Sequence, residues 1–443
     1  EAHTMARIPR RRFLTRSIGA ATLGSAAIRT VAASPGDRIG VAVIGINGMG
    51  HGHLRNLTKR SDVRIVTLCD VDESVLARGV ETVAKSHHEK PKLVADFREV
   101  LQDSAVDAVV IATPHHWHCP IAIPALEAGK DCYVEKPASH VFKEGRALVE
   151  AARKHNRLVQ HGTQMRNTEV TFLAGEVLES GILGEIKMTK AWNVQRGHGM
   201  DPKPDAPVPA GVDYDMWLGP APLRPFNRNR FHFNFRWFWD YAGGLMTDWG
   251  VHLIDIVLYG MDVTAPRSII ASGGKFAYPD DAEETPDTLQ AIYEYEDFTM
   301  IWEHAVGIGL GPFQRDHGVA FIGNEGTLVI DRAKWEVFPE TGTRNSKPYY
   351  KMDPVPTQRV RPGAAGLDQH TQNFIECMKT RNQPRCNAEI GQLAAVNAHL
   401  GNIAFRTNQK VHWNAAEAQF TDNAEANSLM RAHYRQPWTL PTV

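Results

Sequence analysis

The sequence predicts an α/β protein in which an N-terminal domain with a Rossmann-type parallel sheet precedes an α+β domain with an open, mainly antiparallel sheet. Three observations support this prediction. A β-branched run at 38–44 leads directly into a glycine-containing turn. Strand and helix patterns then alternate to about residue 160, as in a parallel sheet, whereas strand patterns dominate from residue 185 onward. We place the domains at 34–160 and 161–366, followed by C-terminal helices and a tail at 367–443 that pack back on the core.

The composition is that of an ordinary globular protein. The chain has 443 residues, 43% of them apolar, with 49 Lys and Arg against 50 Asp and Glu. This composition excludes a disordered or collagen-like chain, and the net charge of −1 argues against nucleic acid or an anionic membrane surface as a partner. The five cysteines are too few and too scattered to form a disulfide framework.

Residues 1–33 have the pattern of a targeting segment. They contain a sequence close to a twin-arginine export signal, Arg10-Arg11-Arg12-Phe13-Leu14, followed by an Ala/Gly-rich stretch. We therefore expect export to the periplasm or the medium by the twin-arginine pathway, which carries folded proteins. The alternative is a basic N-terminal arm. No later run approaches the ~18 apolar residues that span a membrane, so we expect no membrane contact in the mature protein.

The first strand pattern leads into an incomplete dinucleotide-binding fingerprint. Gly45 and Gly50 match the outer glycines of G-x-G-x-x-G, and Asn47, which tolerates a left-handed conformation, stands in place of the middle one. A helix that begins here points its free N–H groups at a pyrophosphate. The predicted contacts in this turn are Gly45, Asn47, Gly48, Met49 and Gly50. The alternative is a βαβ unit that binds no nucleotide.

An acidic residue follows the second strand pattern, at 63–69. Asp70 lies 25 residues after Gly45, close to the spacing expected of the carboxylate that binds the adenine ribose. A carboxylate at this position repels a 2′-phosphate, so the sequence predicts NAD rather than NADP. Asp72 is the alternative acid.

Two further strand patterns end in polar motifs. The strand at 106–112 precedes Thr113-Pro114-His115-His116-Trp117-His118, and the strand at 131–134 precedes Glu135-Lys136-Pro137. Ligands bind at the carboxyl ends of parallel strands. We expect the cofactor to contact Thr113, Pro114, His118, Glu135 and Lys136, and the substrate to contact Trp117. The histidine spacing does not favour zinc, and no metal is predicted.

These motifs, with one later in the chain, resemble those of the Gfo/Idh/MocA family, which includes glucose–fructose oxidoreductase and inositol dehydrogenase. Residues 113–118 are similar to the family's T-P-x-H-W-H, and residues 243–255 resemble its G-G-x-x-x-D-x-G-x-H-x-x-D. The resemblance covers the chain from about Gly36 to the C-terminus. It implies an NAD-linked oxidoreductase with Lys136, Asp248 and His252 as the catalytic set. We expect a homo-oligomer, either a dimer or a tetramer.

The chemistry of this set agrees with alcohol oxidation. Asp248 and His252 are four residues apart, so on a helix they share one face, which Asp255 extends. A carboxylate beside an imidazole orients the ring and raises its basicity. We therefore expect His252 to accept the hydroxyl proton and Lys136 to act as a relay or electrostatic partner. The alternative is an amphipathic helix with a buried structural histidine.

Two segments are predicted to shape the substrate pocket. Residues 159–166 are similar to the family's Q-x-G-T-Q-x-R, and we expect Gln164 to contact the cofactor or substrate and Arg166 to contact the substrate. In 226–241, six aromatic residues fall on odd positions, which is the period of a strand. We expect a sugar or polyol to contact His232, Arg236, Trp237 and Asp240. The alternative is a half-buried strand or a subunit contact.

The remaining patterns complete the second domain. We expect strands at 187–192, 289–295 and 299–304, a hairpin turn at 323–326, loops at 197–213 and 340–366, and helices at 368–380 and 388–405.

The predicted function is that of an exported NAD-dependent oxidoreductase acting on a hydroxyl of a sugar or polyol. Because a dissociable cofactor would be lost outside the inner membrane, we expect NAD to stay bound and to be regenerated in each cycle. One alternative is glycoside cleavage through transient oxidation, although the Y-P-T-H-type motif of the family's N-acetylgalactosaminidases is absent. A second is a non-catalytic sugar or nucleotide sensor, against which the presence of Lys136 and His252 argues.

Overall fold

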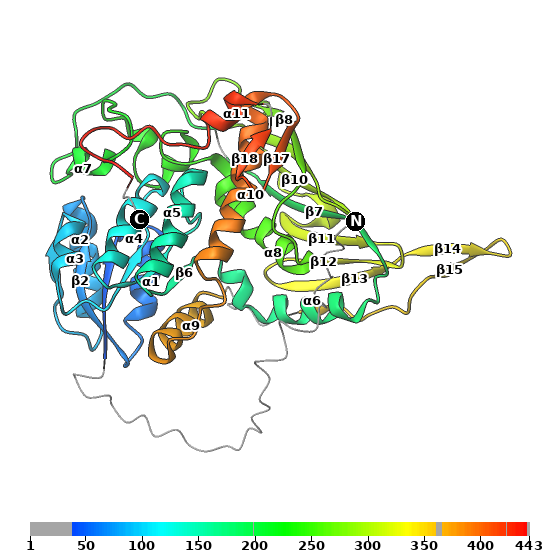
Figure 1. The fold of residues 1–443 in the computed structure, drawn as a ribbon, viewed down its shortest axis with the longest axis horizontal. Coiled ribbons are helices and arrows are strands. Elements are labelled where there is room, and N and C mark those ends of the chain that lie inside the picture. Colours follow the sequence, from blue (N-terminus) through cyan, green and yellow to red (C-terminus); the bar gives the residue numbers. More distant parts are fainter. Residues whose placement is uncertain (1–37, 198, 360–365, 422, 441–443) are drawn as a thin grey trace, which may run out of the picture. The chain divides into compact units, whose positions relative to one another are not determined.

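The structure is a computed structural model that describes residues 38–197, 199–359, 366–421 and 423–440. The predicted export segment at 1–33 lies outside these residues. Within the described chain, two sheets and the helices that cover them form the two expected parts (Figure 1).

A six-stranded, all-parallel sheet forms the N-terminal part, in the order β3-β2-β1-β4-β5-β6. The strands are β1 Ile39–Ile44, β2 Val63–Cys69, β3 Lys92–Val94, β4 Ala108–Ile111, β5 Asp131–Val134 and β6 Val159–His161. The intervening helices are α1 Met49–Leu57, α2 Glu73–Ala84, α3 Phe97–Gln102, α4 His118–Glu127 and α5 Phe142–Lys154. Strands β4 and β5 are buried along their whole length, as expected for a sheet covered on both faces.

The strand order reverses between β1 and β4. Both neighbours of β1 are parallel to it, but the chain runs outward to β2 and β3 on one side and to β4, β5 and β6 on the other. Such a reversal opens a crevice at the carboxyl ends of the strands, where ligands bind in this type of sheet.

A ten-stranded sheet forms the second part, in the order β16-β13-β12-β11-β7-β10-β9-β8-β17-β18. Its pairings are antiparallel except for β7 with β10. The strands are β7 Ile186–Gln195, β8 Ser268–Gly274, β9 Thr288–Glu294, β10 Thr299–Val306, β11 His317–Gly323, β12 Gly326–Ile330, β13 Lys334–Pro339, β16 Gln358–Arg359, β17 Val411–Asn414 and β18 Gln419–Thr421. The predicted fold class and the turn at 323–326 are confirmed.

Helices pack on this sheet and join it to the first. Helix α6, Glu169–Ser180, contacts β12, and α8, Val251–Met261, contacts β7 and β11. Helix α10, Ala388–Thr407, contacts β8 on one side and α5 and β6 on the other, and Figure 1 shows it running between the two parts. Helix α9, Leu367–Thr380, places Phe374 and Ile375 in the core of the first part. The predicted helices at 368–380 and 388–405 are therefore confirmed.

Two predictions of local structure are wrong. Residues 226–241 form no strand; they contain short 3₁₀ turns at Arg228–Arg230 and His232–Trp237. Most of their aromatic side chains pack instead into a cluster around α7, Tyr214–Leu218, whereas Phe233 is exposed. The second error is the loop at 340–366, which contains the hairpin of β14, Thr341–Arg344, and β15, Lys347–Tyr350, together with β16.

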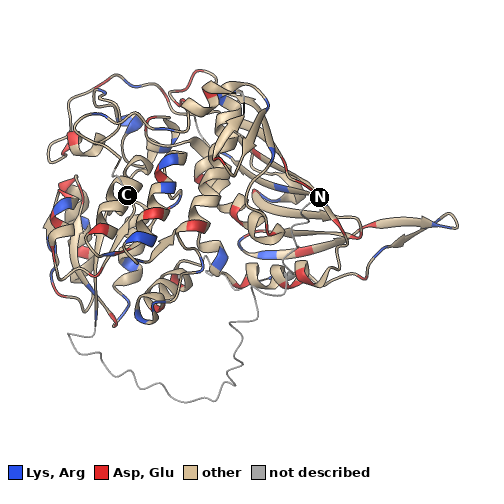
Figure 2. Cartoon of the chain, viewed as in Figure 1, with Lys and Arg blue, Asp and Glu red and all other residues tan. Residues whose placement is uncertain are grey.

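The described surface carries charges of both signs. Figure 2 shows Lys and Arg intermixed with Asp and Glu over both sheets and their helices. Among the described residues, no helix combines the length and the apolar character needed to cross a membrane. All five cysteines are buried and unpaired.

Candidate active site

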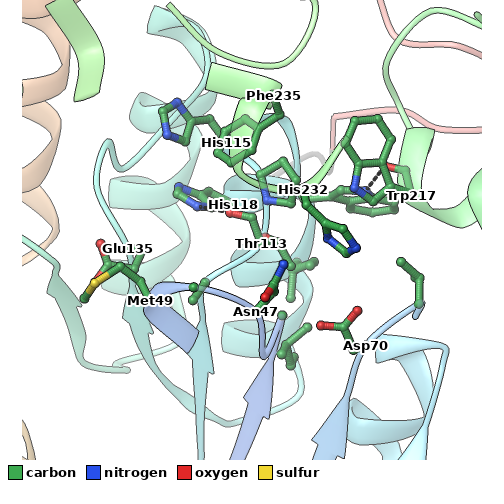
Figure 3. Close-up of a pocket in the computed structure, with 18 of the residues that line it drawn as sticks. Asn47, Met49, Asp70, Thr113, His115, His118, Glu135, Trp217, His232 and Phe235 are labelled. Carbon is green, nitrogen blue, oxygen red and sulfur yellow. Dashed lines mark hydrogen bonds between the residues drawn. The ribbon is translucent and has the colours of Figure 1, made fainter. Parts of the chain in front are cut away.

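A cavity of about 340 Å³ lies at the carboxyl ends of β1 and β4 (Figure 3). Residues from the first part line it, and so do residues from the segment that precedes α8. The predicted site residues that line it are Gly45, Asn47, Gly48, Met49, Asp70, Thr113, Pro114, Trp117, His118, Glu135, Lys136, His232, Arg236 and Asp248. Those that do not line it are Gly50, Gln164, Arg166, Trp237, Asp240 and His252.

The glycine turn has the shape that a pyrophosphate requires. Gly45 and Gly48 have positive φ values of 79° and 53°. A Cβ on Gly50 would lie 1.8 Å from the carbonyl oxygen of Gly45, so only glycine allows α1 to approach β1 this closely. A Cβ on Gly48 would meet no atom within 4 Å, and no side chain caps the N-terminus of α1. The N-terminus of α1 is therefore open at Gly48, as an anion site requires, while the N–H groups of Gly50 and Gly52 donate to the oxygens of Asn47 and Gly48.

Asp70 lies at the end of the cavity next to β2. Its carboxylate accepts hydrogen bonds from the N–H groups of Ile46, at 2.7 Å, and Asp72, at 3.1 Å. Burial raises the pKa of Asp70. The alternative acid, Asp72, caps α2 and lies 2.8 Å from Nε2 of His232. Asp70 rather than Asp72 is thus the acid that lines the cavity with the glycine turn.

The motif after β4, at 113–118, and the motif after β5, at 135–137, are hydrogen-bonded to each other, and the second also contacts His53. Glu135 accepts from the N–H of Lys136 and lies 2.8 Å from Nε2 of His53. The ring nitrogens of His118 lie 2.6 Å from the carbonyl oxygen of Pro137 and 3.0 Å from that of Thr113. Burial lowers the pKa of His118. Within the described ranges, no group of three His, Cys, Asp or Glu side chains is arranged to hold a metal ion.

Lys136 and Asp248 meet at the other end of the cavity. The ammonium of Lys136 donates to the carboxylate of Asp248 and, at 3.0 Å, to its main-chain oxygen. Arg236 donates to the second carboxylate oxygen at 3.3 Å. Burial alone would raise the pKa of Asp248, but the charges of Arg236 and Lys136 outweigh it and lower this pKa to about 2. Asp248 is therefore an anion held between two cations.

His252 does not pair with Asp248, so the predicted orienting and activating contact is wrong. The turn at Met246–Gly250 is π-helical, which changes the i,i+4 alignment, and the carboxylate of Asp248 is bound to Lys136 and Arg236. The Nδ1 atom of His252 is buried without a hydrogen-bond partner. Burial, followed by the charges of Lys136 and Arg332, lowers the pKa of His252 well below 6.5. The ring is thus neutral at neutral pH, with its basicity reduced rather than raised.

Contrary to the sequence prediction, Asp255 does not extend a catalytic face of the helix. It is fully buried and accepts two hydrogen bonds of 2.8 Å from the guanidinium of Arg166. The guanidinium of Arg166 is thus bound to Asp255, and Arg166 does not line the cavity. The sequence predicted instead that Arg166 contacts the substrate. Asp240 pairs with Arg224 and lines a different cavity, and Trp237 packs against the aromatic cluster around α7.

Sequence reasoning missed three residues that the structure brings to this region. His53 lies against Glu135, and its position one turn into α1 was the available signal. The main-chain oxygen of Trp217 accepts from Nε1 of Trp117 at 3.0 Å and lies 3.1 Å from Nε2 of His116. Arg332 stacks over the ring of Trp249 at 4.5 Å and acts on the charges of Asp248 and His252. Nothing in the local sequence distinguishes Arg332.

Two family models match the chain. Residues 39–163 match the model of the NAD-binding Rossmann fold of an oxidoreductase family, Gfo/Idh/MocA. Residues 175–337 and 350–440 match the model of that family's C-terminal alpha/beta domain. The predicted NAD-binding Rossmann domain is thereby confirmed.

Similar proteins include a Glycosyl hydrolase family 109 protein from Shewanella baltica (strain OS185). It is 28% identical over 209 residues, which are 41% of this chain and 45% of the relative. The chain spans less than half of the length of the first curated relatives it matches.

Two solved structures share the fold. One is GenD2 from gentamicin A biosynthesis in complex with NAD, with a TM-score of 0.64 at 20% identity over 86% of this chain and 97% of that one. The other is scyllo-inositol dehydrogenase from Lactobacillus casei with bound NAD(H) and scyllo-inositol. Its TM-score is 0.62 at 20% identity over 85% of this chain and 99% of that one. At these identities the likeness concerns the fold.

Proposed function

This chain belongs to the Gfo/Idh/MocA oxidoreductase family, and on that premise we propose that it is an NAD-dependent enzyme that oxidises a hydroxyl group of a sugar or polyol to a carbonyl. One observation carries the proposal. The cavity that holds the glycine turn at one end holds Lys136, Asp248 and Arg236 at the other. A dinucleotide site and a set of proton-transferring and charge-stabilising groups therefore open into the same space.

The residues present fit the cofactor. The uncapped N-terminus of α1 and the open space at Gly48 suit the pyrophosphate, and Asp70 suits the adenine ribose. Near the opposite end, the Oγ1 atom of Thr113 is buried without a partner, as expected of a group that a ligand completes. When bound, the nicotinamide ring takes up the hydride that leaves the alcohol carbon.

Lys136 is placed to act on the reacting oxygen. Its side chain is 14% exposed and lines the cavity, and its ammonium is bound to Asp248. An ammonium at this position donates to the substrate hydroxyl and stabilises the oxygen as its proton leaves. Arg236 shares Asp248 with Lys136, so it fixes the carboxylate and adds positive charge beside the developing alkoxide.

We propose that His252, which does not itself line the cavity, accepts the substrate proton by way of Lys136 at the cavity wall. A neutral ring with an unpartnered, buried nitrogen is able to accept a hydrogen bond and then a proton. The same positive charges that lower its pKa favour rapid return of the proton, so the ring serves as a relay in both directions. Oxidation releases one proton for each hydride transferred, and reduction takes that proton back.

A sugar or polyol is the substrate class that the pocket favours. Near Lys136 the cavity carries charged and hydrogen-bonding groups, and aromatic rings such as that of Phe235 lie beside them. Aromatic faces pack on the C–H faces of sugar rings, while polar side chains bind hydroxyls. The structural relative with bound scyllo-inositol supports the same class.

A second candidate function is glycoside cleavage by transient oxidation. In that reaction the sugar is oxidised, the aglycone is eliminated, water is added, and the product is reduced again. The net reaction is hydrolysis of the glycoside by one water, with no net change in NAD. The match to glycosyl hydrolase family 109 favours it. The absence of a Y-P-T-H motif argues against the particular pocket of the N-acetylgalactosaminidases.

A panel of sugars, polyols and glycosides, with products identified by mass, tests both functions. Loss of two hydrogens from the substrate supports oxidation, and release of an aglycone without net oxidation supports cleavage. Lys136→Met is the inactive control. A protein that neither binds NAD(H) in a titration nor converts any member of the panel would contradict the proposal.

We also propose that the protein is exported with its cofactor in place. The supporting observation is the twin-arginine-like sequence at 10–14, ahead of a cofactor-binding domain. The test has two parts. Residues 1–33 fused to a reporter should direct export only in cells with an active twin-arginine pathway, and protein purified from the periplasm should release about one NAD(H) per chain on denaturation. Export through another route, or an empty protein, would contradict it.

A homo-oligomer is the proposed assembly. Ile270 and Ile292 are paired on neighbouring strands of the ten-stranded sheet and are 45% and 41% exposed. Light scattering of the purified protein should give the mass of a dimer or tetramer, and the mass of a single chain, 49.3 kDa with residues 1–33 present and less without them, would contradict the proposal.

A further inference from the structure

One segment of the second part crosses the carboxyl edge of the parallel sheet, and we call residues 211–236 the strap. It includes α7 and the two 3₁₀ turns that follow. Figure 1 shows α7 and the loops around it beyond the ends of the parallel strands. The strap therefore passes over the place where the family's cofactor binds.

The first anchor of the strap is a two-stranded bridge to the junction of β2 and α2. Val212 forms an antiparallel bridge with Asp72. The N–H of Glu73 donates to the oxygen of Gly211 at 2.9 Å, and the N–H of Asp213 donates to the oxygen of Val71 at 2.9 Å. This junction directly follows Asp70, so the strap is bonded to the backbone beside the predicted ribose site.

The second anchor lies on the other side of the glycine turn. The oxygen of Trp217 accepts from the indole of Trp117, which lies after β4. The C-terminal tail reinforces this point, because Arg435 donates to the oxygen of Gly219 at 3.0 Å and pairs with Asp215. The strap is thus fixed to the loops on both sides of β1.

The third anchor is His232, which contacts the same junction of β2 and α2 as the first anchor. Its Nε2 lies 2.8 Å from the carboxylate of Asp72. His232 has a positive φ of 50°, a strained conformation for a residue other than glycine, and such strain persists where the surroundings impose it and is concentrated at functional sites. The fourth anchor, Arg236, is bound to Asp248.

Strap and glycine turn line the same cavity. Figure 3 shows Trp217, His232 and Phe235 on one side of it and Asn47, Met49 and Asp70 on the other. A dinucleotide that lies along the glycine turn is therefore covered by the strap, and its release requires the anchors to open.

We infer that the strap is a retaining element for the dinucleotide, and that the His232–Asp72 pair sets how slowly the cofactor leaves. This inference rests on the proposed function, since it requires that NAD(H) binds. It goes further by assigning retention to a contact between the strap, through His232, and the Rossmann domain, through Asp72. Cofactor that is regenerated in place needs such an element, because each escape ends the cycle.

The experiment measures exchange of bound cofactor rather than activity. The full-length protein, loaded with ¹⁴C-labelled NAD, is mixed with excess unlabelled NAD, and the label that remains bound is followed by rapid gel filtration. The variants are His232→Ala and Asp72→Asn; the latter keeps a side chain able to cap α2. The matched control is His412→Ala, at an exposed histidine on β17.

We expect the wild type and His412→Ala to exchange slowly and at the same rate. His232→Ala and Asp72→Asn should each exchange about tenfold faster or more, the equivalent of ~1.4 kcal/mol. Exchange by the wild type within the mixing time, or exchange by both variants at the wild-type rate, would overturn the inference while leaving the proposed function intact. Failure of the wild type to bind NAD(H) at all would instead contradict the proposed function.

Limited proteolysis gives a second readout that does not depend on folding of the variants. The strap contains Arg228 and Arg230, both sites for trypsin. Saturating NAD should slow cleavage at these two residues at least severalfold in the wild type, because the bound cofactor holds the strap closed. Equal cleavage with and without NAD, in protein shown to bind it, would overturn the inference.

Discussion

The ammonium of Lys136 is bound to the carboxylate of Asp248, a residue 112 positions further along the chain. Lys136 follows the fifth strand of the parallel sheet, whereas Asp248 lies in the turn before α8. The reactive end of the cavity therefore exists only when the two sheets and their helices are assembled. This contact makes the Lys136 side chain the natural place to begin testing the mechanism.

Replacement of Lys136 by Met should lower kcat by about 10² or more, as expected for the loss of a charge-stabilising group at the reacting oxygen. NAD binding should persist, because the glycine turn and Asp70 are untouched. Steady-state rates and a fluorescence titration check the two parts. Lys143→Met, at an exposed position on α5, is the control. Near-normal turnover in Lys136→Met would remove Lys136 from the mechanism.

His252→Ala should also lower kcat by about 10², and the wild-type pH profile should show the unusual state of this ring. The pKa of His252 lies well below 6.5, so the ring stays neutral and able to accept a proton as the pH falls through 6.5. The acid limb of kcat/KM should therefore lie below that of an ordinary histidine. A limb centred at 6.5, or one that persists in His252→Ala, would show that another group is the base.

Asp70→Ala should reduce the preference for NAD over NADP. The carboxylate repels a 2′-phosphate and is held in place by the N–H groups of Ile46 and Asp72. We expect the ratio of the two dissociation constants to shift toward NADP by about tenfold, roughly the effect of one charged contact. Titrations of the cofactor-free protein measure it. Tighter binding of NADP by the wild type would contradict the assignment.

Arg166→Met should destabilise the protein rather than impair substrate binding. It leaves the carboxylate of Asp255, which is fully buried, without its partner. Breaking a buried ion pair in this way costs about 3–5 kcal/mol of unfolding free energy. Urea denaturation measures this cost, and KM should change little in the folded fraction. Arg267→Met, which removes an exposed pair with Glu296, should cost no more than about 1 kcal/mol.

The protein should lose stability below about pH 6.5 because of buried neutral histidines. A lowered pKa in the folded state means that the unfolded chain binds more protons once the pH falls below 6.5, so each such ring removes about 2 kcal/mol of unfolding free energy between pH 6.5 and about pH 5. Burial is the largest cause in each case. The rings are His116 and His161, with pKa values of about 3, and His140, His304, His370 and His399, with values of about 4.

Two acids act in the opposite direction. Burial raises the pKa of Glu144 and of Glu283 to about 7, so their contributions are fully present below pH 4.5 and are lost as the pH rises through 7. Urea titrations from pH 5 to pH 8 should nevertheless show a net rise in stability up to about pH 6.5, since the six histidines outnumber these two groups. A maximum at pH 5 would contradict the prediction.

The sequence predicted the architecture, and most of the site residues that it predicted line the cavity. Buried parallel strands and glycine turns are local patterns, so β1, the turn at Gly45 and the motifs at the ends of β4 and β5 could all be found without the structure. Residues 38–44 and 131–134 were placed within about a residue of the observed strands.

The pairing of side chains could not be predicted in the same way. Asp248 and His252 have helical spacing, but a π-helical turn and two competing cations take Asp248 away from His252. The aromatic residues in 226–241 alternate with the period of a strand. In the structure this segment contains 3₁₀ turns, and most of its rings pack in the cluster around Tyr214. In both cases tertiary contacts outweigh a short local pattern.

The positions of the five buried thiols make it possible to follow the unfolding of one part of the chain separately. Cys69, Cys119 and Cys132 lie in the parallel sheet and its helices. Cys377 lies in α9 and Cys386 follows it, and α9 packs into the core of the same part of the molecule. None lies in the ten-stranded sheet, whose interior holds the indoles of Trp192 and Trp302. Alkylation rates in dilute urea thus report on one half of the molecule, and the indoles of Trp192 and Trp302 report on the other in a variant whose other eight Trp residues are replaced by Phe. Comparing the two signals on a single sample reveals whether the halves melt as one cooperative unit or in sequence.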